Sequence, residues 1–146
     1  MSTLPIRLLP GVPLPPYGFV PGRFPHPTRD PEGHSHGQAP PPADPLDPGR
    51  WAGCRDYLLG LDLFNHGYYW EAHEAWEGLW HACGRRGVTA DFLKGLIRLA
   101  AAGVKARAGK PEGVRSHARA ARRLFERVAR ERGPASPRYL GCPSPG

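Results

Sequence analysis

The sequence has few cysteines, no long hydrophobic run and no regular apolar pattern over its first third. Its three cysteines are Cys54, Cys83 and Cys142, and no two of them form a C-x-x-C pair. An odd, scattered set argues against a disulfide framework and against a zinc ribbon. We therefore expect reduced thiols with structural roles.

Signals for membrane insertion and export are also missing. No stretch approaches the ~20 consecutive apolar residues that a transmembrane helix needs. The N-terminus lacks a basic region followed by a sustained apolar run and a small-residue cleavage site. These absences predict a cytoplasmic protein with no membrane partner.

Proline is abundant and unevenly placed. Fourteen of the nineteen prolines lie in residues 1–50, where apolar residues never recur with a helix or strand period. Proline fixes φ and removes a backbone donor, so this region disfavours regular structure. The sequence predicts a disordered leader over 1–46, a helical domain over 47–133 and a flexible tail over 134–146. A domain of that size buries a modest core, which favours a homo-oligomer.

Helix ends and apolar spacing predict an all-α fold. Pro48 follows a capping Asp47, Thr89 caps a later segment and Pro111 begins another, while glycines follow the apolar runs. The predicted helices cover 47–66, 68–83, 89–108 and 111–132. Short glycine-bearing links favour antiparallel neighbours. We expect a compact bundle of about four helices, arranged as two helical hairpins with similar turns, as in helical-repeat proteins.

The segment 64–80 is the richest in chemistry, with three carboxylates, two histidines and three of the four tryptophans. At a hundred degrees per residue, the core side of this helix is formed by Ala72, Trp76, Leu79 and Cys83. His73, Glu77 and Trp80 lie on the edge of that side, and Glu71 faces outward. His73, Glu77 and His81 follow one another in i, i+4 steps, so their side chains can touch.

This segment and the next predicted helix resemble the DUF309 family of small helical proteins. The matching positions are Phe64-Asn65-x-Gly67-x-Tyr69-x-Glu71-Ala72-His73-Glu74-x-x-Glu77-x-x-Trp80 and Phe92-Leu93-x-Gly95-Leu96-Ile97-x-Leu99-Ala100. The resemblance covers about residues 51–130 and implies a compact helical bundle without an established biochemical function. Two positions that are commonly glutamine in the family are Lys94 and Arg98 here.

His73, Glu77 and His81 form a polar column along the helix, and three interpretations of it remain open. It is a satisfied polar ladder at a helix seam, a binding site for a small cationic or aromatic ligand, or a catalytic or metal site. The binding candidates are Asn65, Trp70, Glu71, His73, Glu74, Glu77, Trp80, Lys94 and Arg98. The catalytic candidates are His73, Glu74 and Glu77, and the metal candidates are His73, Glu77 and His81. The spacing lacks the glutamates of a di-iron bundle and the His-Glu-x-x-His order of a zinc peptidase, so the sequence requires no cofactor.

Positive charge is the other candidate feature. Residues 51–133 contain fifteen Lys and Arg against nine Asp and Glu, and six arginines share one face of the last helix: Arg115, Arg119, Arg122, Arg123, Arg127 and Arg130. This face is either solvated or a surface for nucleic acid phosphates or an acidic protein. Lys94, Arg98 and Lys105 form a second stripe that could pair with the glutamates of residues 71–77. A binding or interaction module is the main functional expectation, with a hydrolase using His73 and a nucleic-acid-binding protein as alternatives.

Overall fold

The chain is helical over most of its described length. The computed structural model describes residues 5–39, 42–132, 138–139 and 142–143. Its elements are a 3-10 helix η1 (Pro48–Gly53) and the α-helices α1 (Arg55–Asn65), α2 (Tyr69–Ala82), α3 (Val88–Arg107) and α4 (Pro111–Arg132), with a short antiparallel pairing of β1 (Arg138–Tyr139) and β2 (Cys142–Pro143). The predicted all-α bundle is therefore confirmed.

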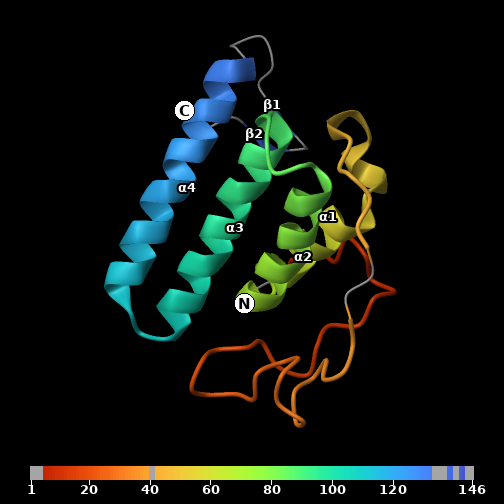
Figure 1. Cartoon of the computed structure of the whole chain (residues 1–146), viewed down its shortest axis with the longest axis vertical. Helices are drawn as coiled ribbons and strands as arrows, with labels where there is room; N and C mark the ends of the chain where they lie inside the picture. The colour runs from red at the N-terminus through yellow and green to blue at the C-terminus, as the bar shows by residue number, and fades with distance from the viewer. Residues whose placement is uncertain (1–4, 40–41, 133–137, 140–141, 144–146) are drawn as a thin grey trace.

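The α-helices pack in chain order. α1 lies on α2, α2 on α3 and α3 on α4, and the two longest helices, α3 and α4, run side by side as a hairpin (Figure 1). Among the described residues, no helix combines the length and the apolar character that a membrane crossing requires. The two predicted hairpins are present, with α2 on α3 as the contact between them.

The two hairpin turns close in the same way, as their sequences predicted. After α1 the N–H of Tyr68 donates to the carbonyl of Leu63, and after α3 the N–H of Lys110 donates to that of Lys105. Gly67 and Gly109 adopt φ of 89° and 70°, the left-handed conformation that this helix ending needs. The turns therefore share one hydrogen-bonding pattern set by a single glycine each.

The first predicted helix is interrupted, which corrects the continuous helix expected from Asp47 onward. Asp47 does cap a helix start, because its side chain accepts from the N–H of Gly49, but η1 ends at Gly53. Cys54 is extended, with φ −88° and ψ 103°, and α1 begins after it. Two glycines within the six residues of η1 lower its helix propensity enough to explain the break.

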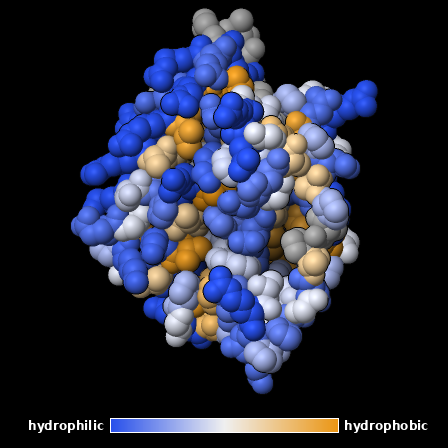
Figure 2. Space-filling view, viewed as in Figure 1, coloured by the Kyte–Doolittle hydropathy of each residue, from blue (hydrophilic) through white to orange (hydrophobic). Residues whose placement is uncertain are grey.

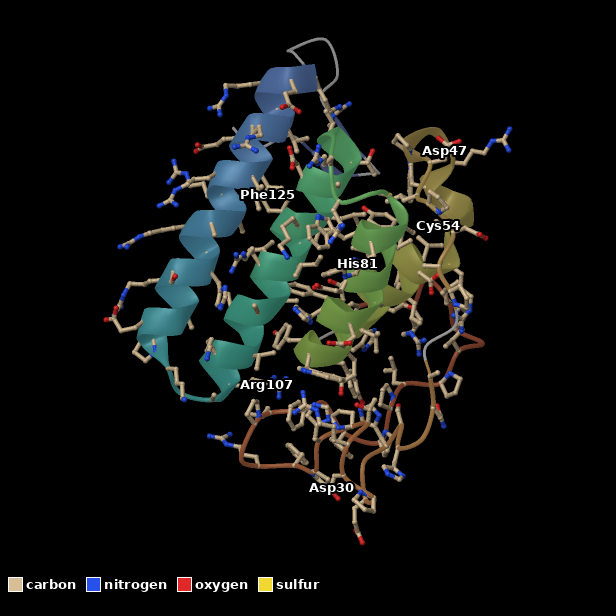
Figure 3. The ribbon with its side chains drawn as sticks, in the orientation of Figure 1. Asp30, Asp47, Cys54, His81, Arg107 and Phe125 are labelled. Atoms are coloured by element: carbon tan, nitrogen blue, oxygen red, sulfur yellow. The ribbon has the colours of Figure 1, made fainter. Side chains whose placement is uncertain are left out.

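Aromatic rings packed against glycines hold each pair of helices together. The indole of Trp76 on α2 fills the space above Gly60 on α1, and Tyr69 on α2 packs on Gly103 of α3. Phe125 points from α4 toward α3 and packs on Gly95 in the same manner (Figure 3). Trp76 is 1% exposed and lies at the centre of the core. A side chain at any of these glycines would collide with a ring, so glycine allows the helices to approach closely at these points.

Residues 5–39 follow an irregular path at the α1–α2 side of the bundle (Figure 1). Phe19 and Val20 are buried there. Two side chains of the helices hold this N-terminal segment: Asp62 of α1 accepts from the N–H groups of Leu8 and Leu9, and Glu71 of α2 accepts from that of Phe19. The disorder of residues 1–46 stays a prediction, which deletion of these residues would test. Most of the predicted flexible tail lies outside the described residues.

Candidate functional site

The predicted site residues are divided between two sides of α2. Trp80 lies toward α3, where Lys94 contacts its ring, and Trp70 and Glu71 lie toward the N-terminal segment. The three tryptophans of α2 do not share a cleft, because Trp76 is buried in the core whereas Trp70 and Trp80 are only partly buried.

His73 lies between two glutamates of the same helix, α2. Its Nε2 is 3.5 Å from Oε2 of Glu77 and its Nδ1 is 3.5 Å from Oε1 of Glu74. His81 approaches the other Glu77 oxygen at 3.9 Å. These distances are longer than hydrogen bonds, and Nδ1 of His73 is buried without a hydrogen-bond partner among the described residues. The hydrogen-bonding capacity of this polar column is therefore only partly satisfied.

The cations of α3 have unusual partners. Lys94 Nζ lies 4.2 Å from the centre of the Trp80 ring, as a cation–π contact. Arg98 Nη1 lies 3.3 Å from Nδ1 of His117 on α4. In the described part of the chain, no carboxylate comes within 4 Å of the charged groups of Lys94, Arg98 or Lys105. The pairing of this stripe with the glutamates of α2, which the sequence suggested, is not formed.

The pKa of His117 is affected by the positive charge of this region. A guanidinium only donates, so Nδ1 of His117 must accept and the neutral ring carries its proton on Nε2. Burial lowers the pKa of His117, and the charges of Arg98, Lys105 and His73 lower it further. We call the set Lys94, Arg98, Lys105, His73 and His117 the basic junction, because it joins α2, α3 and α4.

Glu71 lies on the other side of α2 and is buried, which corrects its predicted outward position. The N-terminal segment covers it, and Nε2 of His34 lies 2.7 Å from its Oε2. Trp70 packs edge-on against Phe19 and His26 of the same segment. A helical wheel treats every outward residue as solvated, so it could not find a cover contributed by another part of the chain.

The remaining candidates lie at the end of α1 and in a groove between α1 and α2. Asn65 is exposed at the end of α1. A groove of about 710 Å³ between α1 and α2 is lined by Glu74, Glu77 and His81, together with Asp56 of α1. Among the described residues no group of three or more His, Cys, Asp and Glu is arranged to hold a metal ion. The catalytic and metal roles of His73, Glu74, Glu77 and His81 stay predictions.

The six arginines of α4 are all exposed, and hydrophilic side chains cover this side of the molecule (Figure 2). Three of them face carboxylates: Arg115 pairs with Glu112, Arg122 with Glu126 at 2.8 Å, and Arg127 with Asp91 at 3.9 Å. Half of the predicted basic face is thus locally neutralised, which weakens its field toward phosphates.

Sequence reasoning missed His117 and Asp62, and it set His34 aside as part of a disordered leader. His117 lies seven residues before Leu124 on the same helix. Helical periodicity places both residues on one side of the helix, and this spacing was a usable signal. His34 and Asp62 are found only once the N-terminal segment is placed on the helices, and no local pattern marks them.

No curated protein and no solved structure matches the chain. A family model does match, described as a domain of unknown function, DUF309, over residues 57–117. The matched segment runs from α1 into α4 and includes every member of the basic junction. Residues 57–117 of the chain are therefore similar to the DUF309 family, in agreement with the resemblance of the sequence.

Proposed function

We propose that the protein is a binding module whose basic junction takes a small anionic ligand with a carboxylate or phosphate group. The observation that carries this proposal is the Arg98–His117 contact at 3.3 Å. A half-buried guanidinium normally meets a carboxylate. Here it donates to an imidazole and has no acidic partner among the described residues.

The chemistry of the junction matches an anion. Arg98 retains further N–H donors, His117 presents Nε2–H, and Lys94 brings three donors at the Trp80 ring. Donors from α3 and α4 thus lie where no carboxylate of the described residues balances the charges of Lys94 and Arg98. An anion with two or three oxygens would supply that balance through charge-assisted hydrogen bonds. This ligand class differs from the small cationic or aromatic ligand that was one of the three interpretations of the sequence, because the free donors lie on Lys94, Arg98 and His117.

Inorganic phosphate, followed by thermal unfolding and calorimetry on the full chain, tests the proposal. A ligand at 100 times its Kd stabilises the native state by roughly 2.7 kcal/mol. We expect phosphate to raise Tm and Arg98→Gln to abolish the rise. Arg86→Gln is the matched control, since it removes one exposed charge from the α2–α3 link. An equal phosphate effect in both variants would refute the site.

A second readout is the titration of His117 by NMR. Burial and three neighbouring cations lower its pKa in the free protein. A bound anion offsets those cations, so saturating phosphate should raise the His117 pKa toward its ordinary value. A His117 titration that does not move with phosphate would contradict binding at the junction, even if phosphate bound elsewhere on the chain.

A further inference from the structure

A second polar array lies on the opposite side of α2, where the N-terminal segment meets the helices. It consists of Ser35, His34 and Glu71. Nδ1 of His34 is 2.8 Å from the hydroxyl oxygen of Ser35, and Nε2 is 2.7 Å from Oε2 of Glu71. The side chains of His34 and Glu71 are only 5% and 6% exposed. The imidazole thus bridges a hydroxyl and a buried carboxylate.

The proton positions follow from these contacts. Glu71 also accepts from the N–H of Phe19, so its carboxylate serves as an acceptor on both sides. The Nε2 that faces it therefore carries the imidazole proton. Nδ1 is left with a lone pair directed at the Ser35 hydroxyl, which is the arrangement of a general base beside a nucleophile.

The local backbone fixes this geometry. The N–H of Ser35 donates to the carbonyl of Pro27 at 2.9 Å, and the N–H of His34 donates to the hydroxyl of Tyr17 at 3.1 Å. A side chain at Gly33 would collide with the carbonyls of His26 and Pro27, so only glycine allows the loop to close this tightly. The array is held by the segment's own hydrogen bonds as well as by Glu71.

A pocket of about 310 Å³ adjoins the array and is lined by Ser35, His34 and Glu71 themselves. Its other walls include the apolar side chains of Leu59, Leu63, Trp70 and Ala75. This volume is at the low end of the roughly 300–1,000 Å³ of small-molecule sites. An apolar pocket of that size beside a hydroxyl suits a short acyl chain.

We propose that Ser35 is a nucleophile, activated by His34 as general base, that accepts a short acyl group from an ester. Ser35 Oγ bonds to the carbonyl carbon of the ester while its proton passes to Nδ1 of His34. The ester C–O bond then breaks, and the leaving alcohol takes that proton. Water attacks the acyl-serine in the same way, which releases the acid and restores Ser35. Glu71 is a positioning residue that holds the imidazole in the required tautomer.

The test uses the full chain and a fluorophosphonate probe, which labels activated serines, with mass spectrometry to locate the label. Ser35 should be labelled at least about 100-fold faster than the exposed Ser116, because a general base contributes on that order. Ser35→Ala should lose the label at this position and keep its fold. Labelling of Ser35 no faster than that of Ser116 would overturn the proposal.

Glu71→Gln separates positioning from mere stability. The glutamine retains the size and one acceptor, but its amide N–H favours the other imidazole tautomer, which removes the lone pair from Ser35. The maximal labelling rate should fall about 10-fold or more, with the half-saturating probe concentration unchanged. Glu131→Gln, an exposed change on α4, is the matched control. An unchanged rate in Glu71→Gln, in a folded protein, would exclude the array, and His34→Gln provides an independent variant with the same expected loss.

Discussion

Replacing Asp62 is the sharpest test of how the N-terminal segment is held. The carboxylate is 0% exposed and accepts three hydrogen bonds, from the N–H of Leu8 at 2.7 Å, that of Leu9 at 2.8 Å and Nε of Arg7 at 3.0 Å. Asp62→Ala leaves two backbone donors without a partner, each at about 1–3 kcal/mol. The segment can detach and become hydrated, which limits the loss. We expect Asp62→Ala to lower the free energy of unfolding by about 2–4 kcal/mol.

Urea denaturation followed by tryptophan fluorescence measures this change, and Tm should fall by roughly 6–14 °C. Asp56→Ala on the same helix is the control. Its side chain is partly exposed and 3.8 Å from Arg55, so it should change stability by less than about 0.5 kcal/mol. In a chain lacking residues 1–46, Asp62→Ala should have almost no effect. Equal losses in the full and the truncated chain would refute the reasoning and would favour the disordered leader that the sequence predicts.

The same carboxylate predicts a pH dependence. Burial acts to raise the pKa of Asp62, but the N–H groups of Leu8 and Leu9 and the guanidinium of Arg7 together lower it below the ordinary 3.8. The unfolded chain therefore binds a proton first as the pH falls. The contribution of Asp62 to stability is complete above its ordinary pKa and is lost as the pH falls through the lower folded value. Asp62→Asn should remove this acid step from the stability curve.

Three further changes have defined outcomes. Gly60→Ala places a methyl group against the indole of Trp76, and overpacking should lower the free energy of unfolding by about 1–3 kcal/mol in urea denaturation; an unchanged midpoint would show that α1 and α2 can separate freely. His117 has a lowered pKa, so acidification between its ordinary and its folded pKa destabilises the native state, and His117→Gln should flatten the stability curve there. His73→Ala removes a ring whose Nδ1 has no hydrogen-bond partner among the described residues, and it should change stability by less than about 1 kcal/mol while weakening phosphate binding; a loss above about 3 kcal/mol would favour the structural seam instead.

The elements that local chemistry controls could be predicted from the sequence. α2, α3 and α4 follow from apolar spacing and from proline and glycine at their ends, and the repeated turns follow from Gly67 and Gly109. The break at Cys54 was harder to predict, because Asp47 and Pro48 indicate where a helix begins but not where it ends. The sequence predicted no structure for the N-terminal segment, because the segment is rich in proline and contains no periodic apolar face.

The sequence indicates several residues of the basic junction but not how they are arranged. His73, Glu77, Trp80, Lys94 and Arg98 were all selected, yet their partners depend on how three helices meet. A wheel drawn for one helix cannot show that Arg98 reaches an imidazole of α4 before any glutamate of α2. Glu71 shows the same limit, because its exposure is decided by a segment of the chain nearly forty residues earlier.

The contact between Arg7 and Asp62 spans 55 residues, whereas each helix packs on its neighbour in the chain. Loop-closure entropy makes such a distant contact form later than the local ones. The N-terminal segment therefore settles after the helices, although it precedes them in the chain. During synthesis and refolding we expect a population with finished helices and a loose N-terminal segment, in which the carboxylates of Asp62 and Glu71 still face water. Refolding kinetics should then show a rapid helical phase followed by a slower docking phase, and the slower phase should disappear in the truncated chain.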